Sequence, residues 1–256
     1  DRNGRITWIH DFSLQSSDGK VIDIQQIRGP FEALFHRVWK GEVENDGFNR
    51  LVVTASLDWR QIVLFRAYAR YLRQIRFSYS QDFIATTLVT HGQLAQALLA
   101  LFEARFNPAA CSSPEQCLAS QTKIEIEINE ALEQVANLSE DRVLRRYVEL
   151  IKATVRTNYY QSASDGTVKR YLAFKLRPAA LSEMPLPLPL YEIFVYSPQV
   201  EGVHLRGGKV ARGGLRWSDR FEDYRTEVLG LVKAQQVKNS VIVPVGAKGG
   251  FVARQL

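Results

Sequence analysis

The chain has 256 residues, a hydrophobic fraction of 46% and a charged fraction of 23%. These values are typical of a globular protein with one large core or two ordinary ones, and they exclude a disordered chain. No apolar run approaches the roughly 20 residues that a membrane-spanning helix needs. The net charge is +6, and residues 201–256 alone carry ten Lys and Arg against five Asp and Glu. This local excess favours a pocket for a small anion over a generally basic surface.

The first residues, 1–5, contain neither an initiator Met nor an apolar signal region, so we expect an internal piece of a longer polypeptide. Residues 5–14 alternate apolar and polar side chains and are predicted to form a strand, and residues 21–24 a second one. Two short strands cannot close a sheet alone. We therefore interpret residues 1–25 as the trailing strands of an upstream β-containing domain.

Residues 26–162 are predicted to form a helical domain of about six helices. Apolar residues recur at the spacing of one helix face in three stretches. These are Ile62, Phe65, Ala69 and Leu72; Ile124, Ile128, Leu132 and Val135; and Leu144, Val148, Ile151 and Val155. Asp58 and Ser139 are predicted N-caps, and Gly92 and Asn107–Pro108 are predicted breaks. We interpret this domain as a structural or assembly module.

The cysteines and histidines show no metal-binding pattern. Cys111 and Cys117 have the spacing of neither a zinc ribbon nor a redox motif, so we expect two free thiols in a reducing compartment. His36 and His91 have no second ligand at position i+4, so we expect neither to bind a metal. His204 is interpreted as structural.

Residues 163–256 change to a mixed pattern and are predicted to form an α/β domain. Residues 172–176 alternate as a half-buried strand does, and residues 191–196 form a second strand after an extended proline-rich run. Asp219 and Glu222 resemble a capping box that begins a helix. Residues 240–243 are predicted to form a buried strand. The fold class is therefore α+β, a mainly helical region followed by a mixed α/β domain.

Three glycine pairs each lie beside a cation in the last fifty residues. They are Gly207–Gly208 before Lys209, Gly213–Gly214 after Arg212, and Gly249–Gly250 after Lys248. Glycine lets the backbone approach a ligand closely. Lys248, in a glycine-rich turn after a predicted strand, would lie where α/β sheets place ligands. An acid–base lysine needs its pKa moved from about 10.4 towards 7–8, a shift that burial near a cation such as Lys238 could supply.

The run ARGGLRWSDRFEDYRTEVLGLVKAQQVKNSVIVPVGAKGGF, residues 211–251, resembles the substrate-binding segment of the large NAD-dependent glutamate dehydrogenases. The preceding residues 186–210 and the TNYYQ at residues 157–161 fit the same family. The resemblance implies oxidative deamination of L-glutamate to 2-oxoglutarate and ammonium, with NAD+ taking the hydride. It also implies amino-acid metabolism, and we expect a cytoplasmic homo-oligomer that binds neither nucleic acid nor membrane.

The resemblance assigns roles to individual residues. Lys248 matches the family's catalytic lysine. Lys238 matches the lysine that binds the α-carboxylate of the substrate, and Arg212 matches the lysine that binds its side-chain carboxylate. The backbone around Gly213, Gly214 and Gly246 completes the substrate site. Arginine replaces the family's lysine at position 212 and Val245 replaces the first glycine of the usual turn. The first departure leaves Lys209 and Arg216 as rival carboxylate ligands.

Parts of such an enzyme are missing from the sequence. No Gly-x-Gly-x-x-Gly occurs in the chain, so we expect NAD to be bound by a domain beyond it. The acidic partner of the catalytic lysine is expected after Leu256. The chain alone should therefore bind no NAD and be inactive. The alternative is a nucleic-acid-binding module, because Arg-Gly-Gly occurs twice in a basic stretch, but the glycines alternate with apolar strands and a helix.

Overall fold

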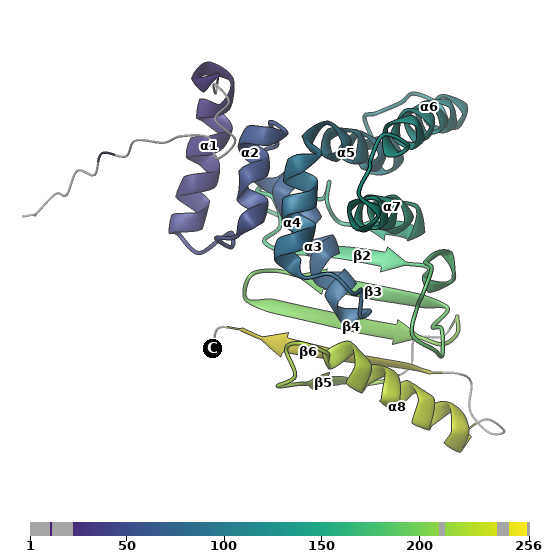
Figure 1. Ribbon diagram of the computed structural model, residues 1–256. Coiled ribbons are helices and arrows are strands. Elements are labelled where there is room, and N and C mark those ends of the chain that lie inside the picture. Colours follow the sequence, from purple (N-terminus) through teal and green to yellow (C-terminus); the bar gives the residue numbers. More distant parts are fainter. Residues whose placement is uncertain (1–10, 12–22, 210–212, 240–245, 255–256) are drawn as a thin grey trace, which may run out of the picture.

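The computed structural model describes residue 11 and residues 23–209, 213–239 and 246–254, with the side chains of residues 236–239 left out. The predicted strands over residues 5–14 and 21–24 fall almost wholly outside these ranges, and Ile24 begins a helix. Helices fill the first part of the described chain, and strands with one further helix fill the rest (Figure 1). The predicted α+β class is confirmed.

Seven α-helices lie between residues 24 and 153, one more than the approximate number predicted. They are α1 (Ile24–Trp39), α2 (Leu51–Thr54), α3 (Trp59–Gln74), α4 (Gln81–Thr90), α5 (Gly92–Phe106), α6 (Pro114–Leu132) and α7 (Leu138–Ala153). A short 3-10 helix, η1 (Gly47–Arg50), precedes α2.

The central helix of this part is α3, and its start is set by side-chain capping. The Asp58 carboxylate accepts hydrogen bonds from the backbone of Arg60 and Gln61, and the Gln61 side chain accepts one from the Asp58 backbone. This reciprocal cap satisfies amide groups that the first helical turn leaves unpaired. The apolar face predicted for this helix, residues 62–72, is buried. The predicted N-cap at Asp58 is thus confirmed.

The breaks between the other helices were predicted in part. Helices α4 and α5 meet at Gly92 with a bend of 98°. A Cβ atom added to Gly92 would overlap the carbonyl oxygen of Thr54, which explains the glycine there. The predicted N-cap at Ser139 was wrong, because Asn137 caps α7 and its side chain accepts from the Ser139 backbone. Val155 does not extend the helix and lies in the first strand.

A six-stranded sheet follows the helices. Its strands are β1 (Thr154–Thr157), β2 (Leu172–Leu176), β3 (Tyr191–Tyr196), β4 (Val200–Arg206), β5 (Leu215–Trp217) and β6 (Ala247–Ala253), in the order β1-β2-β3-β4-β6-β5. Neighbouring strands are antiparallel except for the parallel pair β5 and β6. Helix α8 (Tyr224–Asn239) connects this parallel pair. The strands predicted over residues 172–176 and 191–196 are confirmed.

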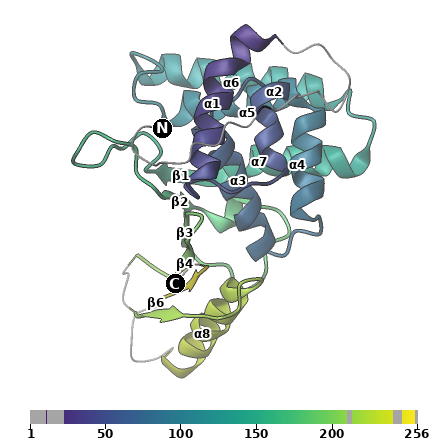
Figure 2. The ribbon, with the colours of Figure 1, turned by 90° about the vertical axis from the view of Figure 1, so that its left-hand side faces the viewer.

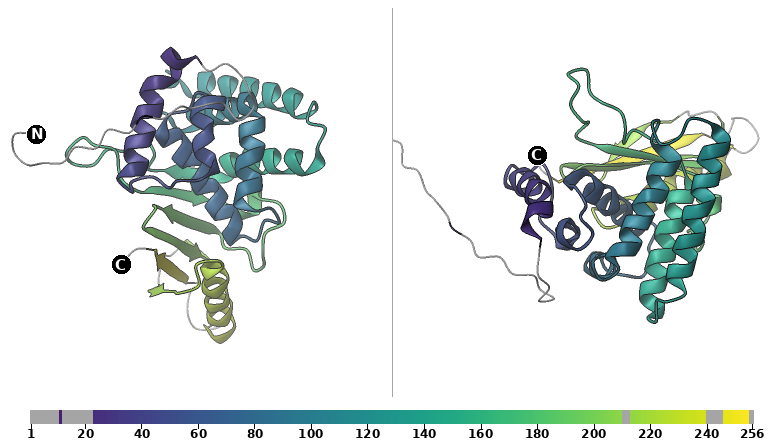
Figure 3. Two further views of the ribbon diagram at one scale, coloured as in Figure 1. Left: turned by 60° about the vertical axis from the view of Figure 1, so that its left-hand side comes forward. Right: turned by 90° about the horizontal axis from the view of Figure 1, so that it is seen from above.

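The helices cover one face of the sheet. The Tyr68 ring of α3 stacks on Phe174 of β2 with 4.5 Å between ring centroids, and the Tyr71 ring packs against Phe194 of β3. At the other end of the sheet, Val228 of α8 packs over β6. Figure 3 shows the helices on this side, and Figure 2 shows α1–α7 gathered at one end and α8 beside β6 at the other. One core therefore runs from the helical part across β2, β3 and β4 to β6.

The prediction of two free cysteine thiols was wrong. The structure joins Cys111 and Cys117 in a disulfide, with their Cα atoms 5.5 Å apart. The residues between them fold back because Ser113 caps α6, which brings the loop against the first turn of that helix. Such a local reversal is not visible in cysteine spacing.

No single helix among the described residues is long and apolar enough to cross a membrane. The bent pair α4 and α5 passes the same test of length and composition when its two helices are taken together.

Candidate functional site

The three glycine-rich segments meet at one edge of the sheet. Strand β4 ends at this edge, and β5 and β6 both begin there, because β4 is antiparallel and β5 parallel to β6. We call residues 207–209, 213–215 and 246–248 the glycine edge. Helix α8 runs back along the sheet, so its last turn also returns towards this edge (Figure 1). The topology thus gathers segments that are about forty residues apart in the sequence.

Backbone contacts hold the glycine edge together. The Gly207 amide donates to the Gly246 carbonyl at 3.1 Å, and the Gly249 amide donates to the Gly214 carbonyl at 3.1 Å. Gly213 lies directly against the main chain of Ala247, where an added Cβ atom would overlap the carbonyl oxygen. Only glycine permits this approach. The glycine pairs therefore fix the packing of the edge, in addition to any contact with a ligand.

Lys248 is the second residue of β6, so the turn predicted around it was wrong. Its Cα atom pairs with that of Leu205 in β4, which places Lys248 on the face of the sheet that α8 covers. The side chain is half-buried. The lysine therefore lies where the strand begins, and the strand predicted over residues 240–243 falls outside the described residues.

The other predicted substrate-binding cations differ from Lys248 in their exposure and in their partners. Lys209 is exposed, and its carbonyl oxygen accepts a hydrogen bond from Arg206. Arg216 of β5 forms an ion pair of 3.1 Å with Glu227 of α8, whose carboxylate also accepts from Ser218 at 2.6 Å. The charge of Arg216 is thus already compensated. Arg212 lies outside the described residues, and so does the side chain of Lys238, whose backbone is in the last turn of α8.

The start of α8 differs from the predicted capping box. Residues 221–223 form turns and the helix begins at Tyr224, so Asp219 is not its N-cap. The first turn is instead held by Arg225, whose guanidinium donates to both carboxylate oxygens of Glu192 in β3 at 2.6 and 2.9 Å. Both side chains have 0% exposure. Burial opposes the charge of Arg225, but the attraction and hydrogen bonds of Glu192 outweigh it and raise the pKa of the guanidinium.

Sequence reasoning missed this buried ion pair. One signal was present, because Glu192 occupies the position two residues before Phe194 and four before Tyr196 on the buried face of β3. A carboxylate in an alternating apolar series needs a partner, since an unpaired buried charge is costly. The sequence gives no indication that this partner lies 33 residues away in α8.

His204 of β4 lies on the opposite face of the sheet from Lys248. Its Cα atom pairs with that of Gly249, and the Leu215 side chain lies over the same glycine. Burial, followed by the charge of Arg206, lowers the pKa of this histidine. The imidazole is therefore neutral at neutral pH.

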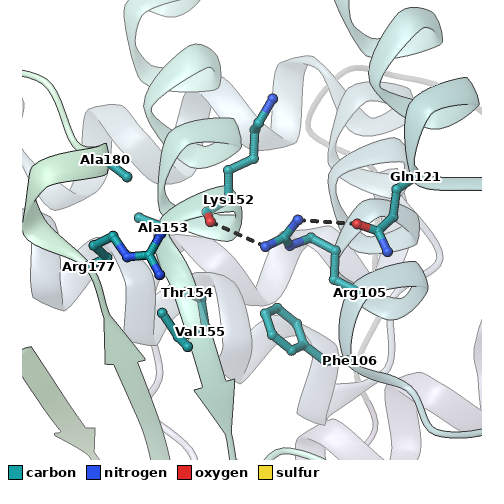
Figure 4. Close-up of a pocket in the computed structure, with 9 residues that line it drawn as sticks. All are labelled: Arg105, Phe106, Gln121, Lys152, Ala153, Thr154, Val155, Arg177 and Ala180. Carbon is teal, nitrogen blue, oxygen red and sulfur yellow. Dashed lines mark hydrogen bonds between the residues drawn. The ribbon is translucent and has the colours of Figure 1, made fainter. Parts of the chain in front are cut away.

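Two hollows in the described structure lie away from the glycine edge. One, of about 290 Å³, is bordered by α5, α6 and the end of α7 (Figure 4). There the Arg105 guanidinium donates to the Lys152 carbonyl and to Gln121, both at 3.2 Å, so it caps the last turn of α7. The other, of about 380 Å³, lies between α3 and residues 165–171. Neither is lined by residues of the glycine edge.

The described residues contain no cluster of three or more side chains that could hold a metal ion. They also do not fit a dinucleotide. The parallel unit β5–α8–β6 has no glycine in the turn between β5 and α8, and Asp219, Glu222 and Asp223 lie there instead. Carboxylates at that point repel a pyrophosphate, whereas dinucleotide-binding units present glycine amides.

Comparisons with known proteins identify the family and several relatives of the chain. A family model described as bacterial NAD-glutamate dehydrogenase, catalytic domain, matches residues 127–256, and one described as glutamate dehydrogenase, helical motif 3, matches residues 43–108. The NAD-specific glutamate dehydrogenases of Halomonas elongata, Pseudomonas aeruginosa and Mycobacterium tuberculosis are 59%, 58% and 47% identical to the chain over 252, 255 and 261 residues. These matches cover 97%, 100% and 99% of this chain but only 15%, 16% and 16% of the relatives.

A mixed sheet whose edge gathers glycine pairs and cations beside a crossover helix defines an α/β site suited to a small anion. With the family model matching half of its length, the chain belongs to the bacterial NAD-glutamate dehydrogenase family.

Proposed function

We propose that this chain forms the substrate-binding part of an enzyme that oxidatively deaminates L-glutamate to 2-oxoglutarate and ammonium with NAD+. The observation that supports the proposal most directly is the glycine edge, where three glycine-rich segments, two of which carry Lys209 and Lys248, converge on one end of the sheet. A dicarboxylate needs two separated cations and a third group at its reacting carbon. Family membership supports this choice of substrate and reaction.

In this proposal each cation has its own task. Arg212 and Lys238 bind the two carboxylates of glutamate, with Lys209 and Arg216 as rivals for the side-chain carboxylate. An arginine can grip a carboxylate with two parallel hydrogen bonds. The Lys248 amine polarises the imino or carbonyl group at the α-carbon and activates water. The backbone of Gly213, Gly214 and Gly246 brings the main chain close to the substrate.

We also infer that NAD is bound elsewhere in the full-length protein. The acidic turn before α8 supports this inference, since it does not fit a pyrophosphate. An isolated chain of residues 1–256 should accordingly show no NAD binding and no turnover. Isothermal titration of this chain with NAD tests the inference, and saturable binding would contradict it.

The test of the catalytic role is Lys248→Ala in the full-length protein. We expect kcat to fall by two orders of magnitude or more, because general acid–base groups typically contribute about 10² to 10⁴. Glutamate affinity should fall much less. The matched control is Lys233→Ala, an exposed lysine on α8. Normal turnover in Lys248→Ala would remove the assignment.

Cytoplasmic location and homo-oligomerisation are proposed on family resemblance. The Cys111–Cys117 disulfide makes location worth testing directly, since reducing compartments rarely keep such bonds. Cell fractionation with thiol trapping, and light scattering of the purified protein, measure the two properties. Recovery in an oxidising compartment or a monomeric mass would contradict them.

A nucleic-acid-binding module remains the alternative from a different class. The described glycines of the two Arg-Gly-Gly runs argue against it, because Gly207 and Gly214 form backbone hydrogen bonds with Gly246 and Gly249 and Gly213 packs against Ala247. A salt-dependent shift of labelled single-stranded DNA at micromolar protein would support the alternative.

A further inference from the structure

Besides packing on β2 and β3, helix α3 contacts the chain that leads into α8, where the last turn of α3 meets the first turn of α8. The Gln74 side chain donates to the carbonyls of Phe221 and Glu222 at 3.1 and 3.3 Å and accepts from the Arg225 backbone at 3.2 Å. Arg73 forms an ion pair with Glu222. Two consecutive residues of α3 therefore hold the chain that leads into α8.

The buried ion pair fixes the same turn to the sheet. Arg225 and Glu192 are both fully buried and joined by two hydrogen bonds, which fixes the orientation of the guanidinium plane as well as its position. Glu192 pairs with Leu205 across β3 and β4, and Leu205 pairs with Lys248 across β4 and β6. Glu192 and Lys248 thus lie in one cross-strand row on one face of the sheet.

Helix α8 transmits any movement of this turn to the glycine edge. A helix of 16 residues is about 24 Å long, so a rotation of about 5° at its first turn moves its last turn by about 2 Å. Its last turn carries the backbone of Lys238, and its middle carries Glu227, which pairs with Arg216 at β5. A displacement of about 1 Å at a reacting site can cost roughly 100-fold in rate.

We propose that Glu192, Arg225 and Gln74 are positioning residues, through which the helical part sets the placement of α8 and hence of the substrate-binding cations. The helical part is then a rigid support for the site and not only an assembly module. This inference rests on the proposed function of the glycine edge. None of the three side chains is required to touch glutamate.

The test removes the ion pair without leaving a charge buried. The double variant Glu192→Leu with Arg225→Met replaces both partners by apolar side chains of similar size, a change that buried ion pairs often tolerate without loss of stability. In the full-length protein we expect a cooperative thermal transition and an unchanged KM for NAD. We expect kcat/KM for glutamate to fall about 10- to 100-fold, mainly through a higher KM.

Gln74→Met is the second variant, because it leaves the ion pair intact and removes only the three hydrogen bonds to residues 221–225. It should raise the KM for glutamate in the same direction. The matched control is Arg66→Met with Asp46→Asn, in which the buried Arg66 of α3 pairs with the partly buried Asp46 before η1, and its bonds stay within the helical part. The control should lower the thermal midpoint and leave the KM for glutamate unchanged.

The outcomes separate the two proposals. If the double variant folds and Gln74→Met folds, and both keep kcat and KM for glutamate within about twofold of the parent, the positioning role is wrong. If only Gln74→Met accumulates as folded protein, the KM of that variant for glutamate decides whether the positioning role is correct. Lys248→Ala, measured in parallel, reports on the proposed function independently, because full turnover there removes the catalytic assignment whatever the positioning variants do.

Discussion

Gly213 lies against Ala247 so closely that the carbonyl oxygen of Ala247 occupies the place of a side chain at position 213. The contact joins the segment before β5 to the start of β6, one residue from Lys248. Gly213→Ala must therefore push the two segments apart. We expect a loss of about 1–3 kcal/mol in stability and at least a tenfold loss of kcat/KM for glutamate.

The control for this variant is its neighbour. Gly214 has no atom within 4 Å of an added Cβ, so Gly214→Ala should lower the thermal midpoint much less. Differential scanning fluorimetry of both variants measures the difference. Equal midpoints would show that the close approach at Gly213 carries no structural cost.

A second glycine contact is expected to govern the helical part. In Gly92→Ala, the new methyl group meets the Thr54 carbonyl at the bend between α4 and α5, which should cost about 1–3 kcal/mol. Gly230→Ala is the matched change in α8, where nothing lies within 4 Å. It should stabilise by about 0.5–1 kcal/mol, because glycine weakens a helix interior. Urea unfolding followed by circular dichroism compares them, and a stable Gly92→Ala would contradict the packing argument.

The rival carboxylate ligands can be separated by charge compensation. Arg216 is already paired with Glu227, so Arg216→Gln should change the KM for glutamate less than about threefold. Arg212→Gln should raise that KM at least tenfold if Arg212 grips the side-chain carboxylate. Steady-state kinetics over a range of glutamate concentrations gives both values. A larger effect at position 216 than at 212 would reverse the assignment.

The lowered pKa of His204 predicts a pH dependence of stability. The unfolded histidine takes up a proton below about pH 6.5, whereas the folded one resists it, so the unfolded state binds more protons there. Stability from this group is present above about pH 6.5 and declines as the pH falls below that value. Thermal midpoints of the parent and of His204→Gln should therefore converge on acidification. If the difference between the two thermal midpoints stays constant over pH 5–8, His204 is not the cause of the pH dependence.

The two predicted strands that the structure confirms, over residues 172–176 and 191–196, are those with a plain alternation. Residues of β2 and β3 alternate between a buried and a half-buried face, and period two is visible without a partner strand. Strand β4 was missed because Glu201 and Gly202 interrupt its apolar series, although both are buried in the fold. Strand β1 was missed because Val155 continues the spacing of the preceding helix.

For the site, the sequence supplied the residue types and the fold supplied their neighbours. The glycine–cation segments and the intervening helix were evident from spacing and resemblance. The directions of β4, β5 and β6 bring these segments to one edge of the sheet. These directions depend on strand pairing and were not evident from the sequence. The Glu192–Arg225 pair could not be predicted for the same reason, because the alternation in β3 indicates that Glu192 is buried but does not indicate that Arg225 is its partner.

The complete burial of Glu192 and Arg225 has a consequence for behaviour in salt. Dissolved ions screen charges that face water and barely reach a pair without solvent contact. Added sodium chloride should therefore leave the ion pair that fixes α8 to the sheet intact. Chloride should instead compete with glutamate for cations that face the solvent, such as Lys209. Inhibition by salt is then expected to be competitive with glutamate and to vanish at saturating substrate.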